Sequence, residues 1–147
     1  MKNISAILFL IMFIGITATA IDSKDKTPSR AVPGINNISC QQALDLIQEH
    51  EGDTNFVIVD FRPEKMYDEA HIERAIFHDV FLEDIDNWLN SLDKKKTYLI
   101  YCTMGHRSDI GLNKMKEMKF ENIYHMNEGI IQWKKLGYKT VSDSTVH

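Results

Sequence analysis

Two short, uninterrupted apolar runs constrain the fold of this chain more than any other feature. The first runs from Phe56 to Val59 and the second from Thr97 to Tyr101. Both are rich in β-branched and aromatic residues without polar alternation, so they predict strands that are covered on both faces. Between them, apolar residues recur at the spacing of an amphipathic helix, at Ile85, Trp88, Leu89 and Leu92. Strands that alternate with helices predict an α/β domain with a mainly parallel sheet.

Local signals predict further elements on either side of these runs. Ser39 followed by Gln42 is a capping box, so we expect a helix that begins there and continues to Gly52. Residues 123 and 124 indicate another short strand, and a last amphipathic helix is expected to end at Gly137, which can adopt a left-handed cap. The expected architecture is a central sheet of about five strands with helices on both faces.

Composition agrees with one folded domain and excludes several classes of protein. The 147 residues, 44% of them hydrophobic, can bury one core but are too few for two comfortable domains. With 17 basic and 21 acidic residues the net charge is −4, so nucleic acid is not an expected partner. Two cysteines are too few for a disulfide scaffold, and the histidines show no metal-ligand spacing. We therefore expect no metal and no cofactor.

The N-terminus has the three-part pattern of a secretory signal peptide. Lys2 is followed by an apolar run from Ile4 to Ile16 and then by small residues up to Ala20. A spanning helix needs roughly 20 apolar residues, so a retained membrane anchor is the less favoured alternative. We expect cleavage near Ala20 and export to the periplasm or the medium, with no stable membrane insertion. The predicted segments are a signal peptide over 1–20, a flexible arm over 21–37, a folded domain over 38–141 and a tail over 142–147.

The segment that indicates chemistry is a loop that follows the second apolar run. Cys102 comes directly after that run, and a short polar turn then opens a helix. Ligands of open parallel sheets bind beyond the carboxyl ends of the strands, where Cys102 is expected to lie. Amide groups of the turn and the positive end of the helix would favour its thiolate, and Arg107 adds forked donors for an oxyanion. The pattern predicts that Cys102 is a nucleophile within an oxyanion-binding loop. The spacing alone is equally compatible with a buried cysteine that has only a structural role.

The pattern C-x-x-G-x-R-S, from Cys102 to Ser108, resembles the active-site loop of the rhodanese family of sulfurtransferases. Three further segments resemble that family in the same order, at Asp60-Phe61-Arg62, from Tyr67 to Ala75, and from Glu128 to Gly137. The resemblance covers about residues 38–141 and implies a rhodanese-like fold. There are departures from the family pattern. Glycine is usual at Ala70, Arg74, Lys119 and Glu128, and alanine is usual at Gly111. We expect the turns near Arg74 and Glu128 to differ locally.

The resemblance also implies an activity and a role for each matching residue. In rhodaneses a cysteine thiolate takes a sulfane sulfur from a donor such as thiosulfate, carries it as a persulfide, and passes it to cyanide or a thiol. Cys102 matches the nucleophile. The loop positions that match the substrate-binding wall are Thr103, Met104, Gly105, His106 and Arg107. Asp60, Arg62 and Ser108 match supporting positions, and for the first two a structural ion pair is the preferred interpretation. We expect a monomer that meets a small anionic sulfur donor and a thiol or cyanide acceptor.

Two other functions stay open at this point. A cysteine phosphatase or arsenate reductase also places a thiolate and an arginine around an oxyanion, but its spacing is C-x5-R, whereas four residues separate Cys102 from Arg107. The other alternative is a rhodanese-like module that binds or regulates without turnover. Cys40 is expected in the first turn of the first helix, too far from Cys102 for the ~7 Å limit of a disulfide. We therefore expect two unpaired thiols.

Overall fold

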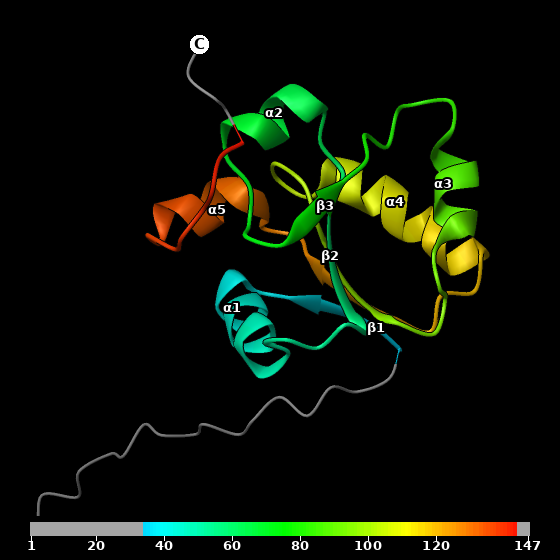
Figure 1. Ribbon diagram of the computed structural model, residues 1–147, viewed down its shortest axis with the longest axis horizontal. Helices are drawn as coiled ribbons and strands as arrows, with labels where there is room; N and C mark the ends of the chain where they lie inside the picture. The colour runs from blue at the N-terminus through cyan, green and yellow to red at the C-terminus, as the bar shows by residue number, and fades with distance from the viewer. Residues whose placement is uncertain (1–33, 144–147) are drawn as a thin grey trace, which may run out of the picture.

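The computed structural model describes residues 34–143, which form a five-stranded parallel sheet with helices on both faces (Figure 1). In chain order the elements are β1 (Gly34–Ile38), α1 (Cys40–Glu49), β2 (Phe56–Asp60), α2 (Glu64–Glu69), β3 (Ala75–Phe77), α3 (Ile85–Ser91), β4 (Thr97–Tyr101), α4 (His106–Glu117), β5 (Asn122–Met126) and α5 (Gly129–Lys135). The strand order is β1-β5-β4-β2-β3, and every neighbouring pair is parallel. The predicted α/β class with a parallel sheet is confirmed.

The two apolar runs form β2 and β4, which pair in register from Phe56↔Thr97 to Asp60↔Tyr101 near the middle of the sheet. Alternate side chains of β4 enter two separate cores. Leu99 packs with residues of α1, α2 and α5, while Ile100 packs with residues of α3 and α4. Figure 1 shows the same two layers, with α1 and α5 on one side of the sheet and α3 and α4 on the other. Both faces of the central strands are therefore covered, which is why their sequences show no polar alternation.

The predicted helix signals are present as hydrogen bonds and backbone angles. Ser39 Oγ accepts from the Gln42 amide at 3.3 Å, and the Gln42 side chain accepts from the Ser39 amide at 2.9 Å, so the capping box of α1 is confirmed. That helix ends at Glu49, before the expected Gly52. Gly137 follows α5 with φ +78°, the left-handed conformation that its sequence position predicted.

The predicted flexible arm over 21–37 is wrong at its C-terminal end. Residues 34–37 belong to β1, which pairs with β5 from Gly34↔Asn122 to Ile38↔Met126. The segment is polar and carries no strand period, but an edge strand needs mainly a backbone partner, which β5 provides. The rest of the arm and the predicted signal peptide lie outside the described residues. Within residues 34–143, no helix is long and apolar enough to cross a membrane.

The positions that depart from the family's glycine pattern have different backbone conformations. Arg74 and Lys119 adopt φ +70° and +66°, which costs a non-glycine residue on the order of 1–2 kcal/mol. Ala70 and Glu128 have φ −170° and −68°, which any residue adopts. At Gly111 an added Cβ would lie 2.5 Å from the Phe61 ring, so a flat ring occupies the space that an alanine methyl would need. Arg74 thus adopts the left-handed conformation that a glycine would favour, although it carries a side chain.

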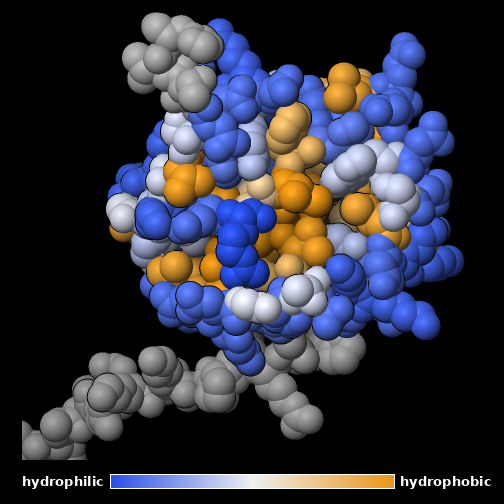
Figure 2. Space-filling model, in the orientation of Figure 1, coloured by the Kyte–Doolittle hydropathy of each residue, from blue (hydrophilic) through white to orange (hydrophobic). Residues whose placement is uncertain are grey.

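Figure 2 shows apolar side chains gathered near the centre of the face on which β2 and β3 lie in Figure 1, surrounded by hydrophilic ones. The C-terminal end of the described chain returns to this part of the molecule. His71 and Val141 form an antiparallel bridge, and Asp143 donates its amide to the Asp68 carbonyl at 3.1 Å. The beginning of the predicted tail is thus hydrogen-bonded to α2.

Candidate functional site: the Cys102 loop

Cys102 lies immediately beyond the carboxyl end of β4, the central strand of the sheet. Residues 103–105 form the turn, and α4 begins at His106. The side chain of Cys102 is almost enclosed, with 1% of its surface exposed, and it packs with the apolar residues on the α3 and α4 side of the sheet. The position is the one expected for a ligand site in an open parallel sheet. The degree of enclosure was not expected.

Two hydrogen bonds reach the sulfur from the residues that the structure describes. The Gly105 amide donates to Cys102 Sγ at 3.2 Å, and Ser108 Oγ lies 3.4 Å from the same atom. The sequence predicted a ring of main-chain amides, and the observed surroundings combine one amide with one hydroxyl. Both groups can donate to a thiolate, so they favour a negative charge on the sulfur even though its other neighbours are apolar.

The loop is held from outside by the first turn of α5. The amide of Ile130 donates to the Cys102 carbonyl at 2.9 Å, and the amide of Ile131 donates to the Thr103 carbonyl at 3.3 Å. In a trans peptide the carbonyl and the next amide point in opposite directions. The amides of Thr103 and Met104 therefore point away from α5, because the carbonyls of the same peptides point toward it.

Two glycines allow this close approach. Gly105 has φ +97°, and an added Cβ there would lie 2.5 Å from the Asn127 carbonyl oxygen. Gly129 has φ +68°, and a Cβ there would overlap the Thr103 carbonyl. Side chains at these positions would separate the loop from the turn between β5 and α5. The glycine of the C-x-x-G-x-R-S pattern is thus required by both its backbone angle and its packing.

The remaining loop residues form a mixed, partly exposed wall. Met104 is 69% exposed and His106 is also exposed, while Thr103 is half-buried with its hydroxyl oxygen enclosed. The guanidinium of Arg107 lies over the ring of Phe81, with Cζ 5.6 Å from the ring centroid. Its Nε is buried and has no hydrogen-bond partner among the described residues. Phe81 was not selected from the sequence, because it lies in a different connection, between β3 and α3.

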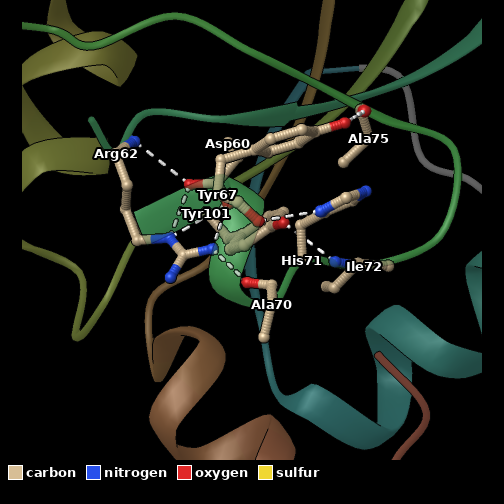
Figure 3. Close-up of polar contacts among 8 residues, drawn as sticks. All are labelled: Asp60, Arg62, Tyr67, Ala70, His71, Ile72, Ala75 and Tyr101. Carbon is tan, nitrogen blue, oxygen red and sulfur yellow. Dashed lines mark hydrogen bonds and ion pairs between the residues drawn. The ribbon is translucent and has the colours of Figure 1, made fainter. Parts of the chain in front are cut away.

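Asp60 and Arg62 form a buried ion pair at the end of β2, as the preferred interpretation of the sequence predicted. Figure 3 shows the Arg62 guanidinium facing the Asp60 carboxylate, with Nη2–Oδ2 at 2.6 Å and Nε–Oδ1 at 2.9 Å. Arg62 also donates to the Ala70 carbonyl at 2.7 Å. Burial opposes the charge of Arg62, but the Asp60 carboxylate raises the pKa of its guanidinium above the ordinary value. The pair therefore fixes the end of β2 to the segment after α2.

The same network reaches Tyr101, the residue before Cys102. The Arg62 Cζ lies 6.0 Å from the centroid of the Tyr101 ring, and the Tyr101 hydroxyl accepts from the Ile72 amide at 3.1 Å (Figure 3). Burial, together with the Asp60 charge, raises the pKa of Tyr101 well above its usual value. Asp60 and Arg62 thus support the strand that carries Cys102.

Sequence reasoning missed one polar residue of the site. His125, on β5, is fully buried, and its Nε2 lies 2.8 Å from Ser108 Oγ, the hydroxyl that contacts Cys102. Its Nδ1 lies 3.1 Å from Asn37 Oδ1 and 3.5 Å from Asp109 Oδ1. Burial lowers the pKa of His125 below the ordinary histidine value. The available signal was a histidine inside an otherwise apolar strand.

Both cysteines are free and buried, in agreement with the prediction of two unpaired thiols. Cys40 is the first residue of α1, and its amide donates to Glu128 Oε2 at 2.7 Å. Its sulfur lies 3.8 Å from the Gly129 carbonyl oxygen. Burial first, and then the Glu128 carboxylate, raises the pKa of Cys40 to about 12.

Comparison with known proteins agrees with this fold. The chain belongs to the rhodanese-like domain family, which matches residues 40–136. A tRNA uridine(34) hydroxylase of Yersinia pestis strain Pestoides F is 30% identical over 122 residues, which cover 80% of this chain and 32% of the relative. The same-named protein of Yersinia enterocolitica is also 30% identical over 122 residues, or 33% of its length. The chain therefore spans about one third of the length of these curated relatives.

Solved structures with similar folds carry the same family description. A crystal structure of a rhodanese-like domain from Anabaena aligns with a TM-score of 0.54 and 26% identity, over 63% of this chain and 97% of that domain. A solution structure of a rhodanese-like domain from Anabaena aligns with a TM-score of 0.61 and 24% identity, over 75% of this chain and 83% of that one. A rhodanese-related protein from Thermoplasma volcanium aligns with a TM-score of 0.60 and 20% identity, covering 72% and 97%.

Proposed function

We propose that this protein is a sulfurtransferase that carries sulfane sulfur as a persulfide on Cys102. The observation that supports the proposal most is the pair of donors on the sulfur, the Gly105 amide at 3.2 Å and the Ser108 hydroxyl at 3.4 Å, at the carboxyl end of the central strand. The first turn of the 12-residue helix α4 follows directly and adds the positive end of its dipole. The same donors suit both a thiolate and the terminal sulfur of a persulfide.

The reaction is a two-step covalent transfer. The Cys102 thiolate attacks the outer sulfur of a donor such as thiosulfate, a new sulfur–sulfur bond forms, and the donor's own sulfur–sulfur bond breaks to release sulfite. A thiolate or cyanide then attacks the terminal sulfur of the persulfide and regenerates the Cys102 thiolate. Each step transfers one sulfur and conserves the total charge, and the protein supplies the nucleophile.

The enclosure of Cys102 sets a condition on this function. With 1% of the side chain exposed, a donor must displace rim side chains to reach the sulfur. Met104 and Phe81 are 69% and 60% exposed, and they are the groups that we expect to move. Arg107, stacked on Phe81, would then meet the anionic end of the donor with the Nε that has no partner in the described structure.

A phosphatase or arsenate reductase is less well supported. The anion-binding loop of such an enzyme needs an arginine that closes over the thiolate, whereas four residues separate Cys102 from Arg107 and the guanidinium faces Phe81.

Export to the periplasm or the medium is part of the proposal and is supported by the N-terminal sequence alone. We also propose that the protein is a monomer. A regulatory module without turnover is the alternative that an activity measurement decides.

The test is turnover with thiosulfate and cyanide, read as thiocyanate formed, together with the intact mass of protein incubated with thiosulfate. We expect thiocyanate from the wild type and a mass gain of one sulfur atom, both abolished in Cys102→Ser. Arg107→Ala should weaken handling of the donor. Cys40→Ser is the matched cysteine control and should keep most of the activity.

Two outcomes would contradict the proposal. A wild-type protein that forms no thiocyanate and gains no sulfur atom would leave the domain as a binding or regulatory module. A loss in Cys40→Ser as deep as that in Cys102→Ser would show that the nucleophile is wrongly assigned. A mass gain without turnover would still support a persulfide on Cys102 and would indicate that cyanide is a poor acceptor.

A further inference from the structure

A continuous chain of polar atoms connects the buried Cys102 sulfur to the surface. Ser108 Oγ lies 3.4 Å from Cys102 Sγ and 2.8 Å from His125 Nε2. On the other side of the imidazole, Nδ1 lies 3.1 Å from Asn37 Oδ1 and 3.5 Å from Asp109 Oδ1. Ser108 and His125 are fully buried, while Asp109 has a side chain that is 62% exposed. These atoms thus join the loop after β4 to α4, β5 and β1.

The partners of His125 determine which ring nitrogen carries the proton. The Asp109 carboxylate only accepts hydrogen bonds, and Asn37 presents its carbonyl oxygen, so Nδ1 must be the donor. In the neutral ring Nε2 is then a bare acceptor. The Ser108 hydroxyl has one hydrogen and three acceptors within reach, namely His125 Nε2, Cys102 Sγ and the Gly105 carbonyl at 2.9 Å. Donation to Nε2 leaves a lone pair of Ser108 Oγ free to accept the thiol hydrogen of Cys102.

We infer that His125, acting through the Ser108 hydroxyl, takes up the proton that Cys102 releases when it becomes a thiolate. The Cys102 thiol proton moves to Ser108 Oγ as the Ser108 hydroxyl proton moves to His125 Nε2. The products are a thiolate and an imidazolium, and the total charge of the group is unchanged. Ser108 then donates to the thiolate while the imidazolium donates to Ser108. His125 is therefore a positioning residue rather than a catalytic one, because Ser108 makes the contact with the reacting sulfur.

The groups around the imidazole suit this exchange. Burial keeps the pKa of His125 below its ordinary value, so the ring is neutral at pH 7. The imidazolium that burial opposes forms only together with the neighbouring thiolate, whose negative charge stabilises it. Among charged groups, Asp109 of α4 favours the imidazolium and Lys116 of the same helix opposes it. Asn37 of β1 and Ser108 of α4 are uncharged. The Arg107 guanidinium faces Phe81.

The test is the pH profile of Cys102 alkylation by iodoacetamide, scored by peptide mass mapping so that Cys40 is counted separately. We expect Ser108→Ala and His125→Gln to react roughly a hundredfold more slowly than wild type at pH 7, which is the lower end of what a missing base costs. The pH of half-maximal rate should move upward in both variants. At pH 10 the three proteins should react at similar rates, because hydroxide then removes the thiol proton directly.

His71→Gln is the matched control. His71 is also a buried histidine, with its Nδ1 2.9 Å from the Tyr67 carbonyl and its ring stacked on Tyr67, and it is outside the chain of atoms just described. Its profile should match the wild type. A loss in Ser108→Ala and His125→Gln that is equal at every pH, or profiles that coincide with the wild type, would overturn the inference.

A second measurement needs no variant. The ¹⁵N chemical shifts of the His125 ring in the wild-type protein at neutral pH should show a protonated Nδ1 and a bare Nε2. A ring protonated at Nε2 would overturn the inference even if a variant fails to fold or the thiol resists alkylation. The inference depends on the proposed function only for the use of the thiolate. Alkylation and ring shifts are measured without turnover. A failure of the proposed sulfurtransferase activity can therefore be distinguished from a failure of the proposed proton transfer to His125.

Discussion

The two cysteines of this chain are equally buried and yet lie in opposite electrostatic surroundings. Cys40 is 0% exposed and Cys102 is 1% exposed. The Cys40 sulfur lies near a carbonyl oxygen, that of Gly129, and near the Glu128 carboxylate, which together with burial raises the pKa of Cys40 to about 12. The Cys102 sulfur meets two groups that can donate to a thiolate, the Gly105 amide and the Ser108 hydroxyl. Burial alone therefore does not decide whether a thiol can react, because the partners of the sulfur have opposite signs at the two sites.

The largest effect that we expect from this difference is in alkylation of the native protein. At pH 7 a thiol with a pKa of 12 is ionised in roughly one molecule in 10⁵, against a few per cent for an ordinary thiol. The rarer Cys40 thiolate is also the stronger nucleophile, which offsets part of this difference, so iodoacetamide should modify Cys102 roughly a hundredfold faster than Cys40. Site-resolved mass spectrometry over time measures both rates in one sample. Equal rates at the two cysteines would contradict the comparison.

The second effect concerns the backbone that supplies a donor to Cys102. Gly105→Ala combines a left-handed φ with a contact between Cβ and the Asn127 carbonyl, and we expect it to lower the free energy of unfolding by roughly 3 kcal/mol. Gly137→Ala is the matched control, since Gly137 also has positive φ but nothing within 4 Å of an added Cβ. It should cost only about 1 kcal/mol. Urea unfolding measures both, and similar losses would show that the loop tolerates the contact.

The smallest effect concerns the charge beside Cys40. Glu128→Gln removes the negative charge while its side-chain oxygen can still accept from the Cys40 amide. We expect the acid dissociation constant of the Cys40 thiol to rise roughly tenfold, because the carboxylate opposes the thiolate. The ¹³Cβ shift of Cys40, followed at high pH, measures this. Glu117→Gln, on the exposed surface of α4, is the control. An unchanged midpoint in Glu128→Gln would leave burial as the whole cause.

Much of the fold is written in local sequence signals. The strands β2 and β4 are continuous apolar runs, and α1 begins with a capping box, so each is recognisable from a few neighbouring residues. Three elements lack such signals. β1 has the polar sequence GINNI, β3 has three residues, and α2 has six residues with Pro63 and no side-chain cap at its start. The two strands form because β5 and β2 supply their hydrogen-bond partners, and α2 packs on the core through Tyr67. A local sequence pattern contains no information about such distant contacts.

The site divides in the same way. Cys102, Gly105 and Ser108 lie within one short motif, so their contact follows from the sequence of the loop. His125 and Asn37 are 88 positions apart and meet because they are register partners in β5 and β1. Their contact depends on which strands pair, and the polar sequence of β1 does not predict a strand. The position of Arg107 over Phe81 is likewise set by a contact between α4 and the connection from β3 to α3, which are distant in the sequence.

The first strand has a practical consequence for work on the isolated domain. The family match begins at residue 40, whereas β1 covers Gly34–Ile38 and is hydrogen-bonded along β5. A recombinant fragment trimmed to the match would expose the backbone donors and acceptors of β5 to other molecules, and such edges promote aggregation. It would also remove the amide that orients the buried imidazole. Low solubility or low activity of such a fragment would result from the loss of β1. The proposed chemistry should therefore be tested on protein that contains this strand.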